Sequence, residues 1–180
     1  MNRKAWLENL INKNKFTVGA EVGVFTGNTF QYLVDRIPSL KLYGIDIWAD
    51  KHVRFDGTTN EQLQELPKHS FQIEIEKWIT ENKCSDRAIL IRSFSDKGAD
   101  RFEDESLDFV FIDASHQYSD VLKDIRAWTP KVKIGGYITG HDINMGGVAQ
   151  AVNESFEKFQ DTGHDNVWSV RKKENASEIS

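Results

Sequence analysis

The sequence predicts an α/β domain, a doubly wound and mostly parallel sheet of six or seven strands with helices on both faces. Short apolar runs alternate along the chain with segments in which apolar residues recur at helical spacing. The runs 88–91 and 107–112 are apolar almost throughout, which is typical of parallel strands buried on both faces. The chain has 180 residues, which suits one domain over 1–173 and a short disordered tail over 174–180.

The apolar runs place six strands. They are expected at 18–24, 42–48, 88–91, 107–112, 137–139 and 167–170. Gly135 and Gly136 are expected to turn the chain into the fifth strand. Beyond Phe159, only the last of these strands has a clear sequence of its own.

Helices are expected where apolar residues return every three or four positions. The segments are 6–11, 30–37, 71–79, 121–128 and 148–159, and Pro38 and Pro130 end two of them. The segment 71–79 also alternates like a strand. Helix is preferred because its polar residues are good helix formers and because parallel strands need a crossover. The polar segment from Asp50 to Lys68 is interpreted as one long loop.

Composition narrows the class of partner. The chain carries 23 basic and 28 acidic residues, so its net charge is −5. Nucleic acid is therefore not an expected partner, because phosphate-binding surfaces are strongly basic. No membrane partner is expected either, since no apolar stretch approaches the roughly 20 residues of a spanning helix and the N-terminus lacks a signal-peptide pattern. The single cysteine, Cys84, fits a reducing compartment, and a cytoplasmic location is expected.

The loop after the first strand has the features of a ligand-binding turn. Gly23 and Gly27 allow a tight turn and a close backbone approach to a ligand at a helix N-terminus. Glu21 precedes them, which disfavours a pyrophosphate and favours a cationic ligand. Asp46 ends the second strand 46 − 27 = 19 residues after Gly27, a spacing typical of an acid that binds ribose hydroxyls.

These motifs resemble those of class I S-adenosylmethionine-dependent methyltransferases. The resemblance rests on Glu21–Gly27, Gly44–Asp46, Phe111–Asp113 and Ile134–Ile138. More specific similarity to the methyltransferase-24 group, which includes sugar and macrolide O-methyltransferases and cephalosporin-hydroxylase-like proteins, rests on Ile112–Tyr118, Asp124, Trp128, Gly135–Gly136 and Gly140–Asp142. The resemblance spans about residues 16–160 and implies a Rossmann-like fold.

The resemblance also implies a site for S-adenosylmethionine. Glu21 would lie near the methionine end and Asp46 would hold the ribose hydroxyls. Ile47 or Trp48 would pack against the adenine, with a core or lid role as the alternative for Trp48. The full set of implied cofactor residues is Glu21, Gly23, Gly27, Asp46, Ile47, Trp48, Ser93, Phe94 and Asp113. Arg92, just before Ser93, departs from the family pattern.

Methyl transfer requires an acceptor held in line with the sulfonium and a group that receives one proton. His116, shortly after the fourth strand, is the candidate general base because an unperturbed histidine titrates near neutrality, and Asp113 is the second catalytic candidate. The alternative for His116 is a structural role at a helix entry. A divalent metal on Asp113 and Asp142 is a further alternative. His141 stands where related enzymes carry an acid, and its nitrogen suits zinc, iron or manganese better than magnesium.

The function expected is O-methylation of a small hydroxylated molecule. One alternative is a non-catalytic S-adenosylmethionine- or nucleotide-binding protein. Another is a nicotinamide-dependent oxidoreductase, which the missing pyrophosphate loop disfavours. Relatives usually add a lid and end the sheet in a two-strand hairpin. This chain offers only 1–15 and the segment from Asp50 to Lys68 as a lid, so the acceptor site is expected to be open or completed by a second subunit of a homo-oligomer.

Overall fold

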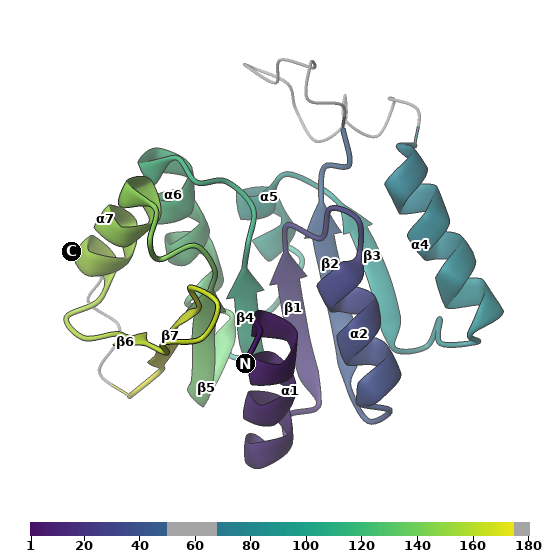
Figure 1. The fold of residues 1–180 in the computed structure, drawn as a ribbon, viewed down its shortest axis with the longest axis horizontal. Coiled ribbons are helices and arrows are strands. Elements are labelled where there is room, and N and C mark those ends of the chain that lie inside the picture. Colours follow the sequence, from purple (N-terminus) through teal and green to yellow (C-terminus); the bar gives the residue numbers. More distant parts are fainter. Residues whose placement is uncertain (50–67, 175–180) are drawn as a thin grey trace.

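The computed structural model describes residues 1–49 and 68–174, which form a seven-stranded sheet flanked by helices (Figure 1). The strands are β1 (Val18–Val22), β2 (Lys41–Asp46), β3 (Ala88–Arg92), β4 (Leu107–Ile112), β5 (Val132–Gly140), β6 (Gln160–Asp161) and β7 (Trp168–Arg171). The helices are α1 (Arg3–Asn14), α2 (Asn28–Arg36), α4 (Ser70–Glu81), α5 (Ser95–Ala99), α6 (Tyr118–Trp128) and α7 (Gly146–Ser155). The strand order is β3-β2-β1-β4-β5-β7-β6. The first five strands are parallel, and β7 runs antiparallel to both β5 and β6.

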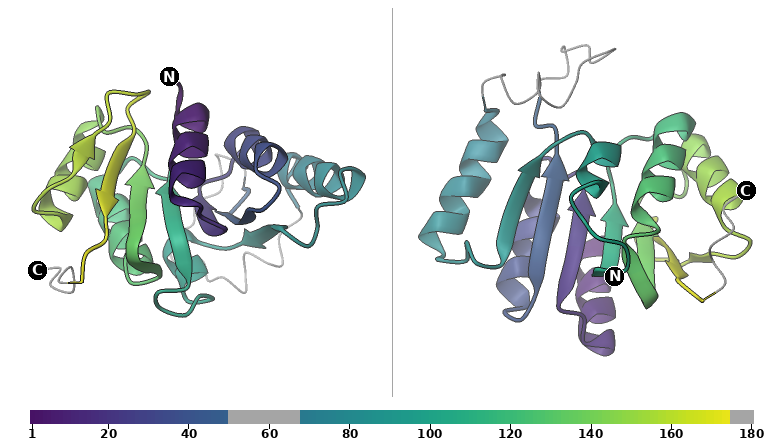
Figure 2. Two further views of the ribbon diagram at one scale, coloured as in Figure 1. Left: turned by 90° about the horizontal axis from the view of Figure 1, so that it is seen from below. Right: turned by 180° about the vertical axis from the view of Figure 1, so that it is seen from behind.

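The helices form one layer on each face of the sheet. α1, α2 and α4 cover one face, and α5, α6 and α7 cover the other (Figure 2). The side chains of β4 divide between the two cores: Phe109 and Phe111 pack with α1, α2 and α4, whereas Val110 and Ile112 pack with α6 and α7. β4 is therefore buried on both faces, which explains why its sequence lacks a polar–apolar alternation.

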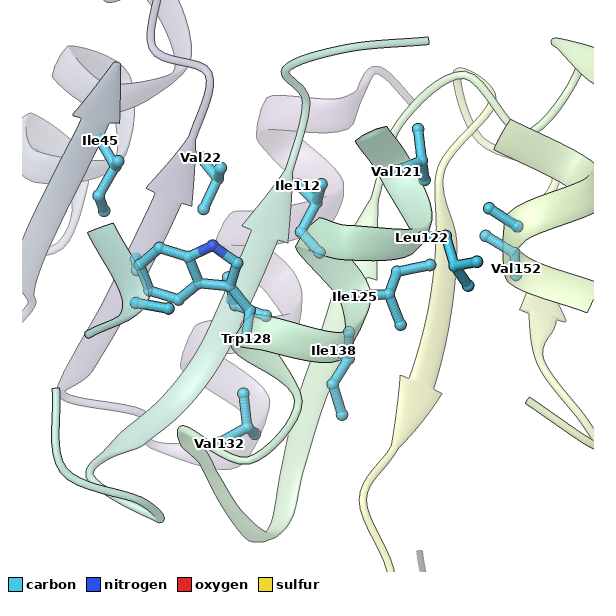
Figure 3. Close-up of a cluster of buried hydrophobic side chains, with 14 of the residues drawn as sticks. Val22, Ile45, Ile112, Val121, Leu122, Ile125, Trp128, Val132, Ile138 and Val152 are labelled. Atoms are coloured by element: carbon cyan, nitrogen blue, oxygen red, sulfur yellow. The ribbon is translucent and has the colours of Figure 1, made fainter. Parts of the chain in front are cut away.

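Trp128 of α6 is one of the largest fully buried side chains (Figure 3). Its ring lies 5.4 Å from that of Phe102, and its indole Nε1 donates to the carbonyl oxygen of Ser95 at 3.2 Å. Burial of such a side chain contributes about 2–3 kcal/mol to stability. The indole therefore ties α6 to the beginning of α5, which follows β3 at the upper edge of the sheet in Figure 1.

The predicted strands and helices are found, with differences at their ends. The segment 71–79 is helical, within α4, as preferred from the sequence. β1 and β2 end two residues earlier than expected, at Val22 and Asp46. α7 ends at Ser155 because Phe156 adopts an extended backbone, with φ −135°. The predicted segment 148–159 therefore extended the helix too far.

The region around β5 differs most from the sequence prediction. β5 begins at Val132, so Gly135 and Gly136 lie inside the strand and not in the turn before it that the sequence predicted. The pairing of β5 with β4 shifts register between Leu107 and Phe109, which accommodates the two glycines. The sheet has seven strands, within the six or seven expected, and the strand without a sequence signal of its own is Gln160–Asp161, which pairs with β7 and completes a terminal hairpin. Both residues of this short strand are exposed, so no apolar pattern marked it in the sequence.

The predicted loop from Asp50 to Lys68 lies outside the described residues except for Lys68, whose ammonium pairs with Glu76 of α4 at 2.8 Å. The expected disordered tail also lies outside them except for Glu174. In the ranges 1–49 and 68–174, no helix has the length and apolar character needed to cross a membrane.

Candidate active site

A large cleft runs along the carboxyl ends of β1 to β5, where ligands bind in open α/β sheets. Its volume is about 1410 Å³. Strand order reverses between β1 and β4, so the loops leaving these two strands face each other across the cleft. Six segments of the chain contribute side chains to the lining of the cleft, among them Arg3, Glu21, Asp46, Ser93, His116 and Asp142.

The loop after β1 is shaped by two glycines. Gly23 has φ +91°, and a Cβ at this position would overlap the carbonyl oxygen of Asp113. The amide of Gly23 donates to the carbonyl oxygen of Ile45 at 2.8 Å, so the exits of β1, β2 and β4 are held together at one residue. Gly27 has φ +83° and caps α2. The predicted cofactor loop thus depends on a backbone geometry that residues with side chains rarely adopt.

Asp46 lies at the exit of β2 and connects two loops. Its Oδ2 accepts a hydrogen bond from the amide of Phe25 at 2.8 Å, and its Oδ1 accepts one from the amide of Trp48 at 2.7 Å. The carboxylate lines the cleft and is fixed in orientation by these two bonds. Each carboxylate oxygen can accept a second hydrogen bond, so the group can also receive two ribose hydroxyls.

The predicted adenine contacts separate into two groups. Ile47, Ser93 and Phe94 line the cleft. Trp48 does not: its side chain is 3% exposed, packs in the core with α2 and α4, and donates from Nε1 to the carbonyl oxygen of Phe25 at 3.1 Å. The structure therefore gives Trp48 the alternative, core role; its backbone adopts φ +39° at this position. Arg92 holds this region by donating from Nε to the carbonyl oxygen of Ile47 at 3.1 Å.

Glu21 is a buried acid that lines the cleft. Its side chain is 2% exposed, and within the described residues its Oε2 has no hydrogen-bond partner. Burial, reinforced by the negative charge of Asp113, raises the pKa of Glu21 well above its usual value. A buried acceptor without a partner is costly, so this oxygen is suited to a donor or a cation supplied by a ligand.

Four side chains meet at the ends of β4 and β5. His116 Nε2 lies 2.7 Å from Asp142 Oδ2, and His141 Nδ1 lies 2.9 Å from Asp142 Oδ1. Asp113 Oδ1 is 3.6 Å from His141 Nδ1. Asp142 therefore bridges the two histidines, and its backbone adopts φ +58° to do so. The sequence prediction had assigned His116 and Asp142 to alternative mechanisms, whereas the structure places them in direct contact.

His116 is the open member of this cluster. Its side chain is 46% exposed, whereas the side chains of His141 and Asp142 are 9% and 16% exposed. Burial raises the pKa of Asp113, and the positive charge of Arg3 opposes that rise. The arrangement consists of one accessible imidazole, oriented by a carboxylate, at the edge of a cleft that also contains the predicted cofactor loop.

Arg3 was not predicted as a site residue. It lies at the beginning of α1, 138 residues before His141, yet its Nη1 is 3.4 Å from both ring nitrogens of that histidine. The same atom is 3.7 Å from Asp113 Oδ2. No sequence pattern marks this arginine, because only the docking of α1 onto the sheet brings it to the cleft.

Asp124 and Ser95 form a second polar pair that the site prediction omitted. Asp124 of α6 is 4% exposed and accepts a short hydrogen bond from the Ser95 hydroxyl at the start of α5. Both residues line the cleft on the side of Phe94. Burial raises the pKa of Asp124 to about 7. Asp124 belongs to the motifs of the resemblance, but no feature of the sequence places it in the cleft.

The spacing of Asp113, His141 and Asp142 fits a divalent metal. One ligand atom from each lies within 4.8 Å of the others, and the donor set comprises two carboxylates and one imidazole. Such a set suits manganese, iron or zinc better than magnesium. Each of the three side chains also has a partner within the protein, namely Arg3, His116 or another member of the set.

The fold is shared with solved structures, two of which are O-methyltransferases. The O-methyltransferase NovP has a TM-score of 0.67 at 12% identity, with 94% of this chain and 78% of that chain covered. CalS11, a TDP-rhamnose 3'-O-methyltransferase of calicheamicin biosynthesis, has a TM-score of 0.66 at 12% identity, with 92% and 77% covered. Cofactor-bound Rv0187 from MTB has a TM-score of 0.65 at 14% identity, with 96% and 80% covered. At these identities the similarity establishes the fold. A search of curated proteins finds no match.

The strand order and the position of the cleft are those of a Rossmann-like α/β domain, in which ligands bind at the carboxyl ends of the strands. The model of the methyltransferase-24 family, described as a methyltransferase domain, matches residues 20–143. The chain belongs to this family and is an S-adenosylmethionine-dependent methyltransferase.

Proposed function

We propose that this enzyme methylates a hydroxyl oxygen of a small molecule and that His116 receives the hydroxyl proton. The observation that carries the proposal is the contact between His116 Nε2 and Asp142 Oδ2, 2.7 Å apart at the edge of the cofactor cleft. A histidine oriented by a carboxylate is a common arrangement for general-base catalysis. NovP and CalS11, which share the fold, are O-methyltransferases, and this supports oxygen as the target atom.

The cofactor is proposed to lie across the switch point of the sheet. Asp46 would accept hydrogen bonds from the ribose hydroxyls, while Ile47, Ser93 and Phe94 border the adenine. Among the described residues no group donates to Glu21 Oε2, and this oxygen would face the cationic amino group of the methionine moiety, which would supply such a donor. Gly23 lets the loop after β1 pack closely on the exit of β4, since a side chain there would collide with the backbone of Asp113.

In the proposed reaction the acceptor oxygen attacks the methyl carbon as the bond from that carbon to sulfur breaks. The electron pair of the breaking bond stays on sulfur and leaves S-adenosylhomocysteine. With Nε2 of His116 donating to Asp142, Nδ1 carries the lone pair that takes the hydroxyl proton. Asp142 stabilises the imidazolium that forms, and Asp113 lines the same part of the cleft.

Asp113, His141 and Asp142 are the residues that would hold a divalent metal. Such an ion would lower the pKa of an acceptor hydroxyl bound to it. The dyad of His116 and Asp142 accounts for proton removal with groups of the chain itself, so the proposal does not require the ion.

The test is turnover. Purified protein would be incubated with S-adenosylmethionine and a panel of phenols, catechols, sugars and nucleotide sugars, and S-adenosylhomocysteine would be measured. Product with at least one hydroxylated acceptor is expected. Calorimetry with S-adenosylmethionine and NAD side by side should show binding of the first only. Binding without turnover on any acceptor would favour a non-catalytic binding protein, and tighter binding of NAD would favour an oxidoreductase.

A further inference from the structure

We propose that the Arg3 guanidinium is a permanent positive charge beside Asp113, His141 and Asp142. It balances the negative charge of Asp113 and keeps the affinity of these three residues for divalent metals low. The proposal concerns the charge balance of the cluster. It holds or fails independently of the methyl acceptor.

The position of Arg3 is fixed by the docking of α1. Leu7 and Ile11 on the inner face of this helix are fully buried against the sheet and α2. Glu8 accepts a hydrogen bond from the Tyr32 hydroxyl at 2.6 Å, which fastens α1 to α2. The backbone amide of Arg3 donates to Asp165 Oδ2 at 2.9 Å, which fastens the beginning of the helix to the loop before β7. Anchors on three sides therefore direct the arginine side chain towards the cleft.

The Arg3 guanidinium is in contact with two of the three residues that could bind a metal, Asp113 and His141. Nη1 lies 3.7 Å from Asp113 Oδ2 and 3.4 Å from each ring nitrogen of His141. Nε lies 3.4 Å from the Thr29 hydroxyl, which holds the inner end of the side chain. Two of the three residues that could bind a metal are thus in contact with a permanent positive charge.

The negative charges around Asp113 explain why a cation is needed beside it. Three acids lie close together at this end of the cleft: Glu21, Asp113 and Asp142. Among the described residues that line the cleft, Arg3 and Lys123 carry the positive charges. Lys123 lies on α6, where its ammonium is 4.0 Å from Asp120. Arg3 is therefore the cation that faces the cluster at the ends of β4 and β5.

A divalent ion on Asp113 and His141 would lie within a few ångströms of the guanidinium. Two like charges about 4 Å apart repel noticeably even in water, and the repulsion doubles for a dication. Metal binding therefore requires Arg3 to withdraw, whereas an acceptor hydroxyl or oxyanion would gain its N–H donors. The arginine and the metal are alternatives at this cluster.

The experiment measures binding of Mn²⁺ alone to the full chain by calorimetry and by loss of the free-ion electron paramagnetic resonance signal. Arg3→Gln is expected to bind Mn²⁺ about tenfold or more tightly than the unmodified protein, because the competing charge is gone. Arg3→Lys, which keeps the charge, should gain less than Arg3→Gln. Lys4→Gln is the matched control, since the Lys4 ammonium lies over the Tyr32 ring instead, and should change nothing.

Adding Asp113→Asn to Arg3→Gln should remove the gain, which assigns the bound ion to this cluster. An affinity of Arg3→Gln within about threefold of the unmodified protein would overturn the proposal. So would binding of Mn²⁺ by the unmodified protein with a Kd on the order of 1 µM or below, a measurement that needs no variant to fold. Circular dichroism spectra of all variants would confirm that the fold is intact.

Discussion

His116 Nε2 and Asp142 Oδ2 are 2.7 Å apart, although the two residues are 26 positions apart in the sequence and follow different strands. β4 and β5 are parallel neighbours, so the loops after them leave the sheet side by side. The contact fixes the orientation of the imidazole of His116, which is otherwise exposed to solvent. The proposed chemistry depends on this relationship.

His116→Ala is expected to lower turnover about 10²- to 10⁴-fold, the usual contribution of a positioned acid–base group, while leaving the affinity for S-adenosylmethionine nearly unchanged. Asp142→Asn should lower turnover less, because the imidazole remains. His164→Ala, on the loop between β6 and β7, is the control. Full activity of His116→Ala that persists in a chelator would contradict the assigned role. Loss of activity in chelator, with Asp113→Asn and Asp142→Asn most damaging, would indicate metal activation instead.

Asp46→Asn is expected to weaken S-adenosylmethionine binding by about 1.5–3 kcal/mol, or roughly 10- to 100-fold in Kd, because a charged acceptor of hydroxyl hydrogen bonds is lost. The carboxylate also accepts the amides of Phe25 and Trp48, so a modest loss of stability should accompany the change. Calorimetry measures the affinity, with the exposed Asp35→Asn of α2 as control. Unchanged affinity would show that Asp46 does not contact the ribose.

Glu21→Gln should have opposite effects on stability and binding. The raised pKa of Glu21 means that its charged form is disfavoured in the folded protein, so stability is lost as the pH rises through that pKa. An amide relieves this cost, and the melting temperature without cofactor should increase by about 2 °C or more near neutral pH. Affinity for S-adenosylmethionine should fall about tenfold, since the amino group loses its counter-charge. If Glu21→Gln changes neither the melting temperature nor the affinity for S-adenosylmethionine, the position assigned to this acid is contradicted.

The raised pKa of Asp124 predicts that the stability of the protein depends on pH. Its pKa is about 7 in the folded protein against 3.8 for the unperturbed group, so between these values the folded state binds more protons than the unfolded state. The free energy of unfolding should therefore fall as the pH rises from 4 to 8, with Asp124 contributing about 2–4 kcal/mol of that fall. Urea unfolding of the wild type and of Asp124→Asn over this range tests the effect. Parallel curves for the two proteins would disprove it.

The sequence alone determined the class of the fold and the loops that matter. Apolar runs and helical spacings marked β1 to β5, β7 and the longer helices because burial on one or both faces leaves a periodic pattern. Gly23 and Gly27, together with Asp46, marked the proposed cofactor loop because these positions require unusual backbone freedom or a charged side chain at a strand end. The two-residue strand β6 left no such pattern, since neither of its residues is buried.

The tertiary structure alone decided which side chains meet in the cleft. Trp48 and Ile47 are adjacent in sequence, yet one packs in the core and the other lines the cleft, and only the packed structure shows which of them does which. Arg3 reaches His141 only through the docking of α1, and Asp142 meets His116 only because β4 and β5 are neighbours. These contacts join residues distant in the chain, and their geometry depends on packing of whole elements. Local periodicity and motif spacing therefore do not predict which of these residues come into contact.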